Sequence, residues 1–277
     1  YKATTVNLQK IKADSYDRSK IFNQYPSDTN ILRLGMEHLP HDIAATGEQV
    51  LQDSVLELIK LLKKETSCTN IVFSGGLFQN VALNRALLNS EFENCYFPSA
   101  PSDSGLSLGA ALFVKNRNKP NLPNTLSAYL GPSFTENEIK AVLDSHRLIY
   151  KKHRNISKVV AKKITEGASV GWFQGKAEFG PRALGNRSLL GDVRYNIKDT
   201  VNTIKRRQKF RPFAPAILEE FALEYFDGYM NEYMQFTAEA LHDYSSVTHV
   251  DGSARVQVVR KDSVSYTHLT LPTNREV

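Results

Sequence analysis

The chain has 277 residues, of which 41% are hydrophobic and 23% charged, and its formal net charge is +6. This composition is ordinary for a globular protein, and the length has room for one large domain or two modest ones. No apolar run approaches the roughly 18 residues that a membrane-spanning helix needs, so we expect no membrane partner.

The first residues and the two cysteines indicate how the chain begins and in which compartment it works. Residues 1–30 show no clear periodicity and the first residue is Tyr1, so we expect that the chain does not begin at a natural start. Cys68 and Cys95 each adjoin an apolar stretch, which predicts buried thiols rather than a disulfide or a metal pair. Free thiols fit a reducing cytoplasm, the localisation that we expect.

The first regular element is an amphipathic helix over residues 41–64, followed by a strand–loop–helix unit. Residues 70–73 predict a short buried strand, Ser74-Gly75-Gly76 a loop, and residues 80–88 a helix. Paired glycines before a helix let the backbone approach a ligand, and a helix N-terminus favours phosphate. Asn80 and Asn84 lie on one face of this helix, where they either reach one ligand or cap the turn.

A second unit repeats this arrangement. Residues 95–97 predict a strand, 98–104 a loop, and 105–113 a helix rich in small residues that packs closely. Asp103 precedes this helix, and its spacing favours an N-cap over a metal ligand.

A polar stretch with three prolines, residues 115–133, predicts a linker and a domain boundary. Beyond it, Thr135 and Glu138 form a capping box that starts a helix through Leu143. A second helix is expected over residues 157–166 and a strand over 169–174.

The basic segment from Lys176 to Arg211 is the most informative part of the chain. It holds ten basic and three acidic residues, a net charge of +7 against +6 for the whole chain. Charge focused in this way concentrates anions, and arginines among glycines and prolines suit planar or phosphate anions. A nucleic-acid patch or a solvated basic face are the alternatives.

The rest of the chain carries weaker signals. We expect a helix over residues 199–209, with Asn202, Lys205 or Arg206, and Lys209 on one face and Val201, Ile204 and Phe210 toward the core. A strand over 216–218 and a short helical piece over 221–226 follow. The aromatic residues between 225 and 236 could stack bases or fill a core, and we favour the core. His249, Asp251 and Arg255 could project towards a site, although a lone histidine is more often structural than catalytic. Residues 263–277 have the character of a non-native tail.

Five blocks of the chain resemble one enzyme family, the O-carbamoyltransferases, which include nodulation protein U and the cephamycin and tobramycin carbamoyltransferases. The blocks are SGGLFQNVALN, PSAPSDSGLSLGAAL, GWFQGKAEFGPRALGNRSLLGDVR, IKRRQKFRPFAPAIL and VTHVDGSARVQVV. The resemblance implies an α/β fold in two parts. Residues 1–114 would be the C-terminal lobe of an actin/Hsp70 ATPase-like domain, and residues 134–262 a partial YrdC-like domain with a twisted mixed sheet.

The resemblance also implies an activity. The YrdC-like part would form carbamoyl adenylate from carbamoyl phosphate and ATP, and the ATPase-like part would pass the carbamoyl group to a hydroxyl of a small-molecule acceptor. Implied cofactors are ATP, Mg²⁺ with the ATP, and Fe²⁺ or another divalent metal. A homodimer is one arrangement that the family allows.

Site residues follow from the matched motifs. Catalytic roles fall on Lys176, Arg182 and Arg211. Carbamoyl phosphate or adenylate would contact these three together with four further cations, Arg187, Lys205, Arg207 and Arg255. Gly75, Gly76 and Asn80 would bind the nucleotide, and the resemblance raises Asp103 to a metal ligand.

The chain departs from the family pattern in two places. The H-x-x-x-H metal pair and the segment with an N-T-S-F-N-like motif are missing, so we expect an internal fragment that is inactive alone. The alternatives are a module related to tRNA threonylcarbamoylation and an RNA-binding module that uses the basic surface. We favour neither, so nucleic acid is not an expected partner.

Overall fold

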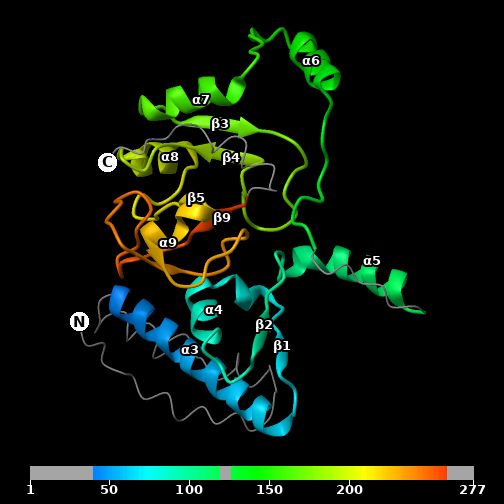
Figure 1. Ribbon diagram of the computed structural model, residues 1–277, viewed down its shortest axis with the longest axis vertical. Helices are drawn as coiled ribbons and strands as arrows, with labels where there is room; N and C mark the ends of the chain where they lie inside the picture. The colour runs from blue at the N-terminus through cyan, green and yellow to red at the C-terminus, as the bar shows by residue number, and fades with distance from the viewer. Residues whose placement is uncertain (1–39, 119–125, 261–277) are drawn as a thin grey trace, which may run out of the picture. The chain divides into compact units, whose positions relative to one another are not determined.

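A computed structural model describes residues 40–118 and 126–260 of a mixed α/β chain (Figure 1). Residues 119–125 of the expected linker lie outside the described residues, and so do the chain start and the 263–277 tail. The chain divides into two compact units, residues 1–69 with 90–93, and residues 70–89 with 94–277. The domain boundary expected within 115–133 stays a prediction.

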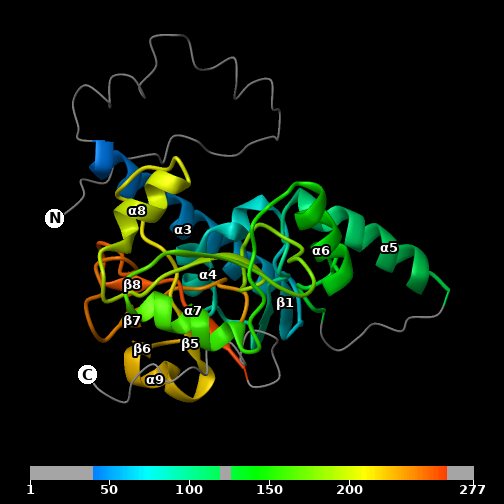
Figure 2. The ribbon, with the colours of Figure 1, turned by 90° about the horizontal axis from the view of Figure 1, so that it is seen from above.

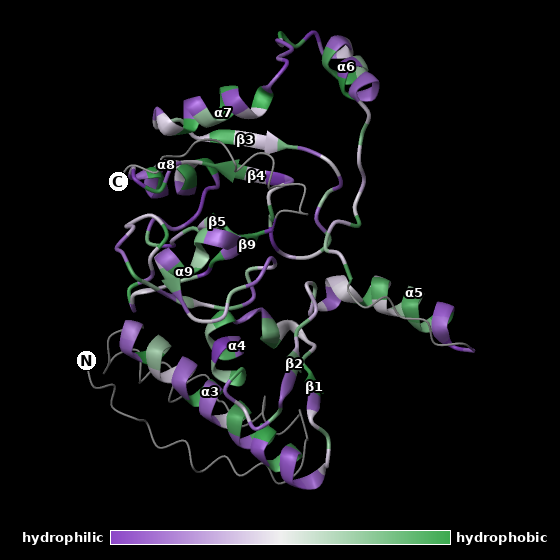
Figure 3. Ribbon diagram, in the orientation of Figure 1, coloured by the Kyte–Doolittle hydropathy of each residue, from purple (hydrophilic) through white to green (hydrophobic). Residues whose placement is uncertain are grey.

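The described part of the first unit is dominated by helix α3, Pro40–Glu65, which confirms the predicted amphipathic helix. Hydrophobic and hydrophilic residues alternate along it (Figure 3). Asp42 lies in its first turn and Lys63 in its last, which complements the helix dipole. The Lys63 ammonium donates to the Cys68 carbonyl and lies 4.9 Å from the centroid of the Phe92 ring.

The second unit begins with two short strands that were predicted, β1 (Asn70–Val72) and β2 (Asn94–Tyr96), and they pair in parallel. The expectation that the first strand is buried is wrong at Val72, which is 66% exposed. The 3₁₀ helix η1 (Gly76–Gln79) and helix α4 (Val81–Leu87) follow β1. The 3₁₀ helix η2 (Asp103–Gly105) and helix α5 (Leu106–Asn116) follow β2. Ile71 on β1 is buried, and Phe73 just beyond the strand stacks on Phe97, with ring centroids 4.7 Å apart.

The expectation that the helix after Asp103 packs closely is wrong. Within the described residues no side chain of α5 is buried, and Phe113 is 71% exposed. The close approach lies just before the helix, because a Cβ on Gly105 would sit 2.1 Å from the Ala100 carbonyl oxygen. Within α5 itself, a Cβ on Gly109 would have no atom of the described residues within 4 Å.

Two helices and an antiparallel strand pair form the next part. Helix α6 (Glu136–Ser145) carries the predicted capping box, and α7 (Ile156–Thr165) confirms the second predicted helix. Strand β3 (Val170–Phe173) was also predicted. It pairs with β4 (Arg187–Leu190), which lies within the basic segment and was not predicted.

Helix α8 (Ile197–Ile204) ends five residues earlier than predicted. Arg206 has a φ of 50°, and the Arg207 amide donates to the Asn202 carbonyl, so the chain turns out of the helix here. The shared helical face expected for Asn202, Lys205 and Lys209 therefore does not exist. Val201 faces the core as expected, whereas Ile204 and Phe210 are exposed.

The remaining strands form two small sheets. Strand β5 (Ala216–Leu218) pairs in parallel with β9 (Gln257–Val259). After 3₁₀ helix η3 (Glu219–Phe221) and helix α9 (Ala222–Tyr225), strands β6 (Phe226–Asp227), β7 (Ala238–Ala240) and β8 (Ser253–Ala254) make an antiparallel sheet (Figure 2).

Core packing in this region confirms part of the aromatic prediction. Phe226 packs in a buried cluster with Ala238, Ala254 and Val256. Phe236 is also buried, but Tyr229 is 58% exposed and does not fill the core as expected.

Two further expectations concern cysteines and membranes. Both cysteines are free, but Cys68 is exposed and Cys95 half-buried, so the prediction of buried thiols is wrong for Cys68. Among the described helices none is long and apolar enough to cross a bilayer.

Candidate anion-binding site

The glycine-rich stretch from Gln174 to Arg187 folds around a carboxylate. Oε1 of Glu178 accepts hydrogen bonds from the backbone amides of Leu184 (2.7 Å), Asn186 (2.8 Å) and Arg187 (3.2 Å). A carboxylate that collects three amides makes charge-assisted bonds and closes the loop on itself. Sequence reasoning counted Glu178 only as an acid among bases and missed this role.

Buried amide side chains fasten the loop. Asn186 is 1% exposed, and its Nδ2 donates to the Lys176 carbonyl over 2.6 Å. The Leu184 carbonyl accepts both the Tyr129 hydroxyl (2.9 Å) and Nε2 of Gln257 (3.0 Å), which joins the loop to β9. The loop that carries Lys176 and Arg182 is therefore held in one conformation.

Glycine is required where this loop meets the segment after β2. Gly180 has a φ of +129°, and a Cβ there would lie 3.1 Å from the Ser99 carbonyl oxygen. A side chain at this position would be strained and would push the two segments apart.

Arg187, one of the predicted anion ligands, is occupied by protein atoms. Its Nη1 donates to the carbonyls of Gln174 and Asn186, and its Nη2 to those of Pro132 and Gly175. Its guanidinium carbon lies 3.5 Å from the centroid of the Phe173 ring. In the described structure Arg187 thus ties the β3–β4 pair to its neighbours, beside a shallow cavity of about 360 Å³.

Four other arginines, which we call the arginine cluster, come together from distant segments: Arg182, Arg207, Arg211 and Arg255. Burial lowers the pKa of Arg255 to about 9, and repulsion from the other three guanidinium groups contributes to this shift. Burial, Arg207 and Arg255 likewise lower the pKa of Lys205. The structure therefore brings together five of the seven predicted anion ligands.

The positive charge of the cluster is not balanced by acids. Within residues 40–118 and 126–260, none of the four arginines or Lys205 forms an ion pair with a carboxylate. The Nε of Arg255 is buried without a hydrogen-bond partner. Fixed guanidinium groups with unused donors have the charge and the N–H groups that binding a polyanion requires.

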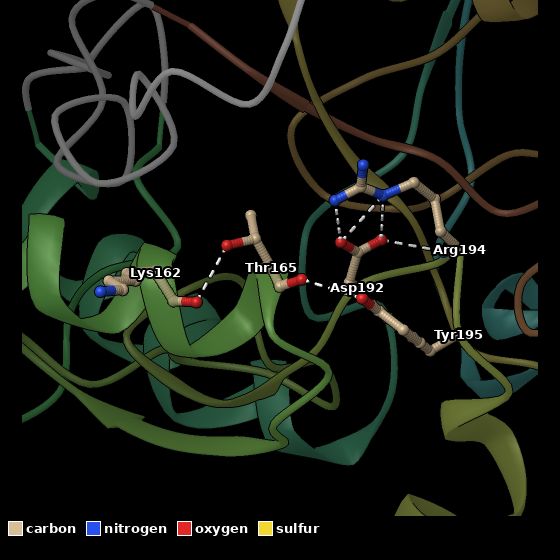
Figure 4. Close-up of polar contacts among 5 residues, drawn as sticks. All are labelled: Lys162, Thr165, Asp192, Arg194 and Tyr195. Atoms are coloured by element: carbon tan, nitrogen blue, oxygen red, sulfur yellow. Dashed lines mark hydrogen bonds and ion pairs between the residues drawn. The ribbon is translucent and has the colours of Figure 1, made fainter. Parts of the chain in front are cut away.

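Arg194 shows the contrasting, neutralised arrangement (Figure 4). Its guanidinium binds the Asp192 carboxylate through Nε (3.0 Å) and Nη2 (2.5 Å). Burial raises the pKa of Asp192, but the hydrogen bonds from Arg194 outweigh this effect and the pKa is lowered. The neighbouring Tyr195 hydroxyl donates to the Thr165 carbonyl at the end of α7. Arg194 therefore belongs to the scaffold.

Members of the cluster are oriented by carbonyl and amide oxygens. Arg182 donates from Nη2 to the Gln79 carbonyl (2.9 Å) at the end of η1. Arg207 donates from Nε to Oδ1 of Asn202 (3.0 Å) and from Nη2 to the Pro212 carbonyl (3.1 Å). Lys176 is exposed, and in the described part of the chain its ammonium makes no hydrogen bond or ion pair.

The structure agrees only in part with the nucleotide loop predicted at Gly75, Gly76 and Asn80. Gly75 has a φ of +122°, and its amide donates to the Pro101 carbonyl over 2.6 Å. Oδ1 of Asn80 accepts the amides of Ala82 and Leu83, so the cap interpretation of Asn80 is confirmed. Because these amides are used, the first turn of α4 does not offer them to a phosphate. Nucleotide binding by Gly75, Gly76 and Asn80 stays a prediction.

Asn84 is fully buried and acts as a tether. Its Nδ2 donates to the carbonyls of Phe78 (2.8 Å) and Gln235 (3.0 Å). Nε2 of Gln235 in turn donates to the carbonyls of Phe97 and Pro98. The ligand role considered for Asn84 is therefore replaced by a structural one.

Asp103 is exposed and begins η2, and neither η2 nor α5 has a side-chain cap. The N-cap interpretation of Asp103 is therefore wrong. Among the described residues no three His, Cys, Asp or Glu side chains are placed to hold a metal ion. One exposed carboxylate does not make a metal site by itself, and metal binding by Asp103 stays a prediction.

The turn before Arg255 is ordered by polar contacts. His249 Nδ1 lies 3.0 Å from the Ser253 hydroxyl, and Asp251 accepts from the amide and hydroxyl of Ser253. Burial and Arg255 lower the pKa of His249, against an opposing effect of Asp251. These contacts give His249 a part in ordering the turn, and its role at a site stays a prediction.

Comparison with known proteins identifies the family. Residues 1–112 match the carbamoyltransferase N-terminus and residues 161–275 the carbamoyltransferase C-terminus. The chain belongs to the carbamoyltransferase family. All four members of the arginine cluster lie in the C-terminal match, and Gly75 and Asp103 lie in the N-terminal one.

Several relatives come from nodulating bacteria. Nodulation protein NolO of Bradyrhizobium diazoefficiens is 36% identical over 247 residues, which are 81% of this chain and 44% of the relative. Nodulation protein NolNO of Sinorhizobium fredii is 33% identical over 80% of this chain and 35% of its own length. Nodulation protein U of Azorhizobium caulinodans is 31% identical over 80% and 40%. The chain thus spans less than half the length of these relatives.

Proposed function

We propose that the protein transfers a carbamoyl group from carbamoyl phosphate to a hydroxyl of a small-molecule acceptor, through a carbamoyl adenylate made from ATP. The observation that carries this proposal is the arginine cluster with its unbalanced charge. In this proposal, residues 134–262 of the chain form the YrdC-like adenylating part. Residues 1–114 form the C-terminal lobe of an ATPase-like part.

The charges of the substrates explain why such a cluster is needed. Carbamoyl phosphate and ATP are both polyanions, so bringing them together is opposed by Coulomb repulsion unless fixed cations offset it. Guanidinium groups also bind phosphoryl oxygens through two parallel N–H donors, which orients the phosphorus for attack. Arg182, Arg211 and Lys176 are the residues that we assign to this role.

The proposed reaction has three steps, which are hydrolysis of carbamoyl phosphate, adenylation and carbamoyl transfer. Water cleaves carbamoyl phosphate to carbamate and inorganic phosphate, and a carbamate oxygen then attacks the α-phosphorus of ATP. The bond from that phosphorus to the β-phosphate bridging oxygen breaks, and pyrophosphate leaves. The acceptor hydroxyl later attacks the carbamoyl carbon, loses its proton, and displaces AMP.

A pyrophosphate exchange assay tests the adenylation step. Because the chain is expected to be inactive alone, the longer protein that contains it is incubated with ATP, carbamoyl phosphate and radiolabelled pyrophosphate, and label in ATP is measured. Label should enter ATP only when carbamoyl phosphate is present, and Arg255→Ala should abolish the exchange. Exchange that does not depend on carbamoyl phosphate would contradict the proposal, and so would the absence of exchange from the longer protein.

A further inference from the structure

The turn after α8 carries three of the five clustered cations, Lys205, Arg207 and Arg211. It has no regular secondary structure of its own, since α8 ends at Ile204 and β5 begins at Ala216. The side chains on this turn must therefore be positioned by other contacts. Arg255, the fifth cation, lies between strands β8 and β9.

Asn202 holds this turn on α8. It is fully buried on the last turn of α8, with an exposed fraction of 0%. Its Nδ2 donates to the Lys209 carbonyl (3.3 Å) and the Arg211 carbonyl (2.9 Å). Its Oδ1 accepts from Nε of Arg207 over 3.0 Å. One amide thus uses both N–H donors and its oxygen on this turn.

The same contacts determine how the Arg207 guanidinium is presented. Nε is bound by Asn202 and Nη2 by the Pro212 carbonyl, and the Arg207 guanidinium carbon lies 4.9 Å from the centroid of the Phe213 ring. With one edge bound and one face against an aromatic ring, the plane of the guanidinium is fixed. The Nη1 edge makes no hydrogen bond within the described residues.

We infer that Asn202 is a positioning residue for anion binding, which presents the free Nη1 edge of Arg207 to a phosphate or pyrophosphate group held in the arginine cluster. This inference rests on the proposed function, because it concerns the same site. Asn202 touches no ligand itself, and it acts through the orientation of Arg207. A guanidinium fixed in advance loses less conformational entropy when it binds than a freely rotating one.

A double-mutant cycle tests this role, with inorganic pyrophosphate as the probe and calorimetric titration of the full chain as the readout. Asn202→Ala should weaken pyrophosphate about tenfold, in line with the loss of a hydrogen bond to a charged group. In an Arg207→Ala background the same substitution should weaken it less than about twofold, since the group that it positions is absent.

Thr203→Ala is the matched control, because Thr203 is the next residue on α8, its side chain is exposed, and within the described residues its hydroxyl donates to the Asp199 carbonyl on the same helix. It should leave pyrophosphate affinity unchanged. An equal loss from Asn202→Ala in both backgrounds would show a merely structural role and overturn the inference. If the unaltered chain does not bind pyrophosphate, the proposed anion site itself fails.

Arg207→Lys keeps the test valid if Asn202→Ala does not fold. Arg207 is half-buried near the surface, and lysine keeps its charge but has no Nε–H to be held by Asn202. This variant should weaken pyrophosphate binding about tenfold or more relative to the unaltered chain. Affinity equal to that of the unaltered chain would overturn the inference.

Discussion

Arg255 shows at the residue scale how binding and stability oppose each other. Its charge is buried among three other guanidinium groups, and its Nε has no partner. A folded-state pKa below the ordinary value means that folding disfavours the charged side chain. The cluster therefore destabilises the chain without a ligand, and a bound polyanion relieves that cost.

We predict that Arg255→Met raises the melting temperature of the chain in anion-free buffer, because it replaces a buried charge with an apolar side chain of similar length. Pyrophosphate should raise the melting temperature of the unaltered chain and leave that of Arg255→Met unchanged. Both temperatures can be measured by differential scanning calorimetry. A fall in the melting temperature of the variant in anion-free buffer would show that Arg255 stabilises the unliganded fold.

Asp192 gives a pH dependence at the same scale. Its pKa in the folded state lies below the ordinary 3.8, because the bonds from Arg194 outweigh the effect of burial. Its contribution to stability is therefore complete above the unfolded pKa and is lost as the pH falls through the folded pKa. Asp192→Asn should lower the free energy of unfolding at pH 6, and the difference should shrink below about pH 4.

Urea unfolding between pH 7 and pH 3.5 measures this difference. Asp243→Asn, at an exposed position, is the control and should change stability little at any pH. A difference between Asp192→Asn and the unaltered chain that grows as the pH falls would contradict the assignment.

At the scale of elements, the loop from Gln174 to Arg187 depends on Glu178. Replacing its carboxylate with the isosteric amide in Glu178→Gln keeps an acceptor oxygen but removes the charge that strengthens three hydrogen bonds. We expect a loss of about 1–3 kcal/mol in the free energy of unfolding. Glu91→Gln, at an exposed position, should change it by less than about 0.5 kcal/mol. Equal effects on denaturant midpoints would contradict the role of Glu178.

Elements with local signals were predictable from the sequence, and those without were not. The capping box of Thr135 and Glu138 and the amphipathic period of α3 are local, so α6 and α3 were placed correctly. The end of α8 depends on Asn202 bonding to carbonyls up to nine residues away, and the sequence pattern does not reveal that choice. Strand β4 was missed because its pairing with β3 spans the basic loop.

At the scale of the whole molecule, the charge pattern predicted an anion site but did not indicate which basic residues come together. Arg182, Arg207 and Arg255 meet only because three separate segments fold together. Arg187 and Arg194 cannot be told apart from them in the sequence. The Arg187 guanidinium, however, donates to backbone carbonyls, and the Arg194 guanidinium binds the Asp192 carboxylate. The roles of Glu178 and Asn202 were missed because a polar residue that orders a loop resembles any other in a sequence.

Calorimetric titration of carbamoyl phosphate into the chain, with Arg182→Ala and Arg211→Ala alongside, tests the central claim most directly. The account predicts that the unaltered chain binds carbamoyl phosphate and that both variants lose binding while keeping their circular dichroism spectrum. Thr203→Ala should bind as the unaltered chain does. A folded chain that binds RNA with strong salt dependence but does not bind carbamoyl phosphate would contradict the claim and identify a nucleic-acid surface instead.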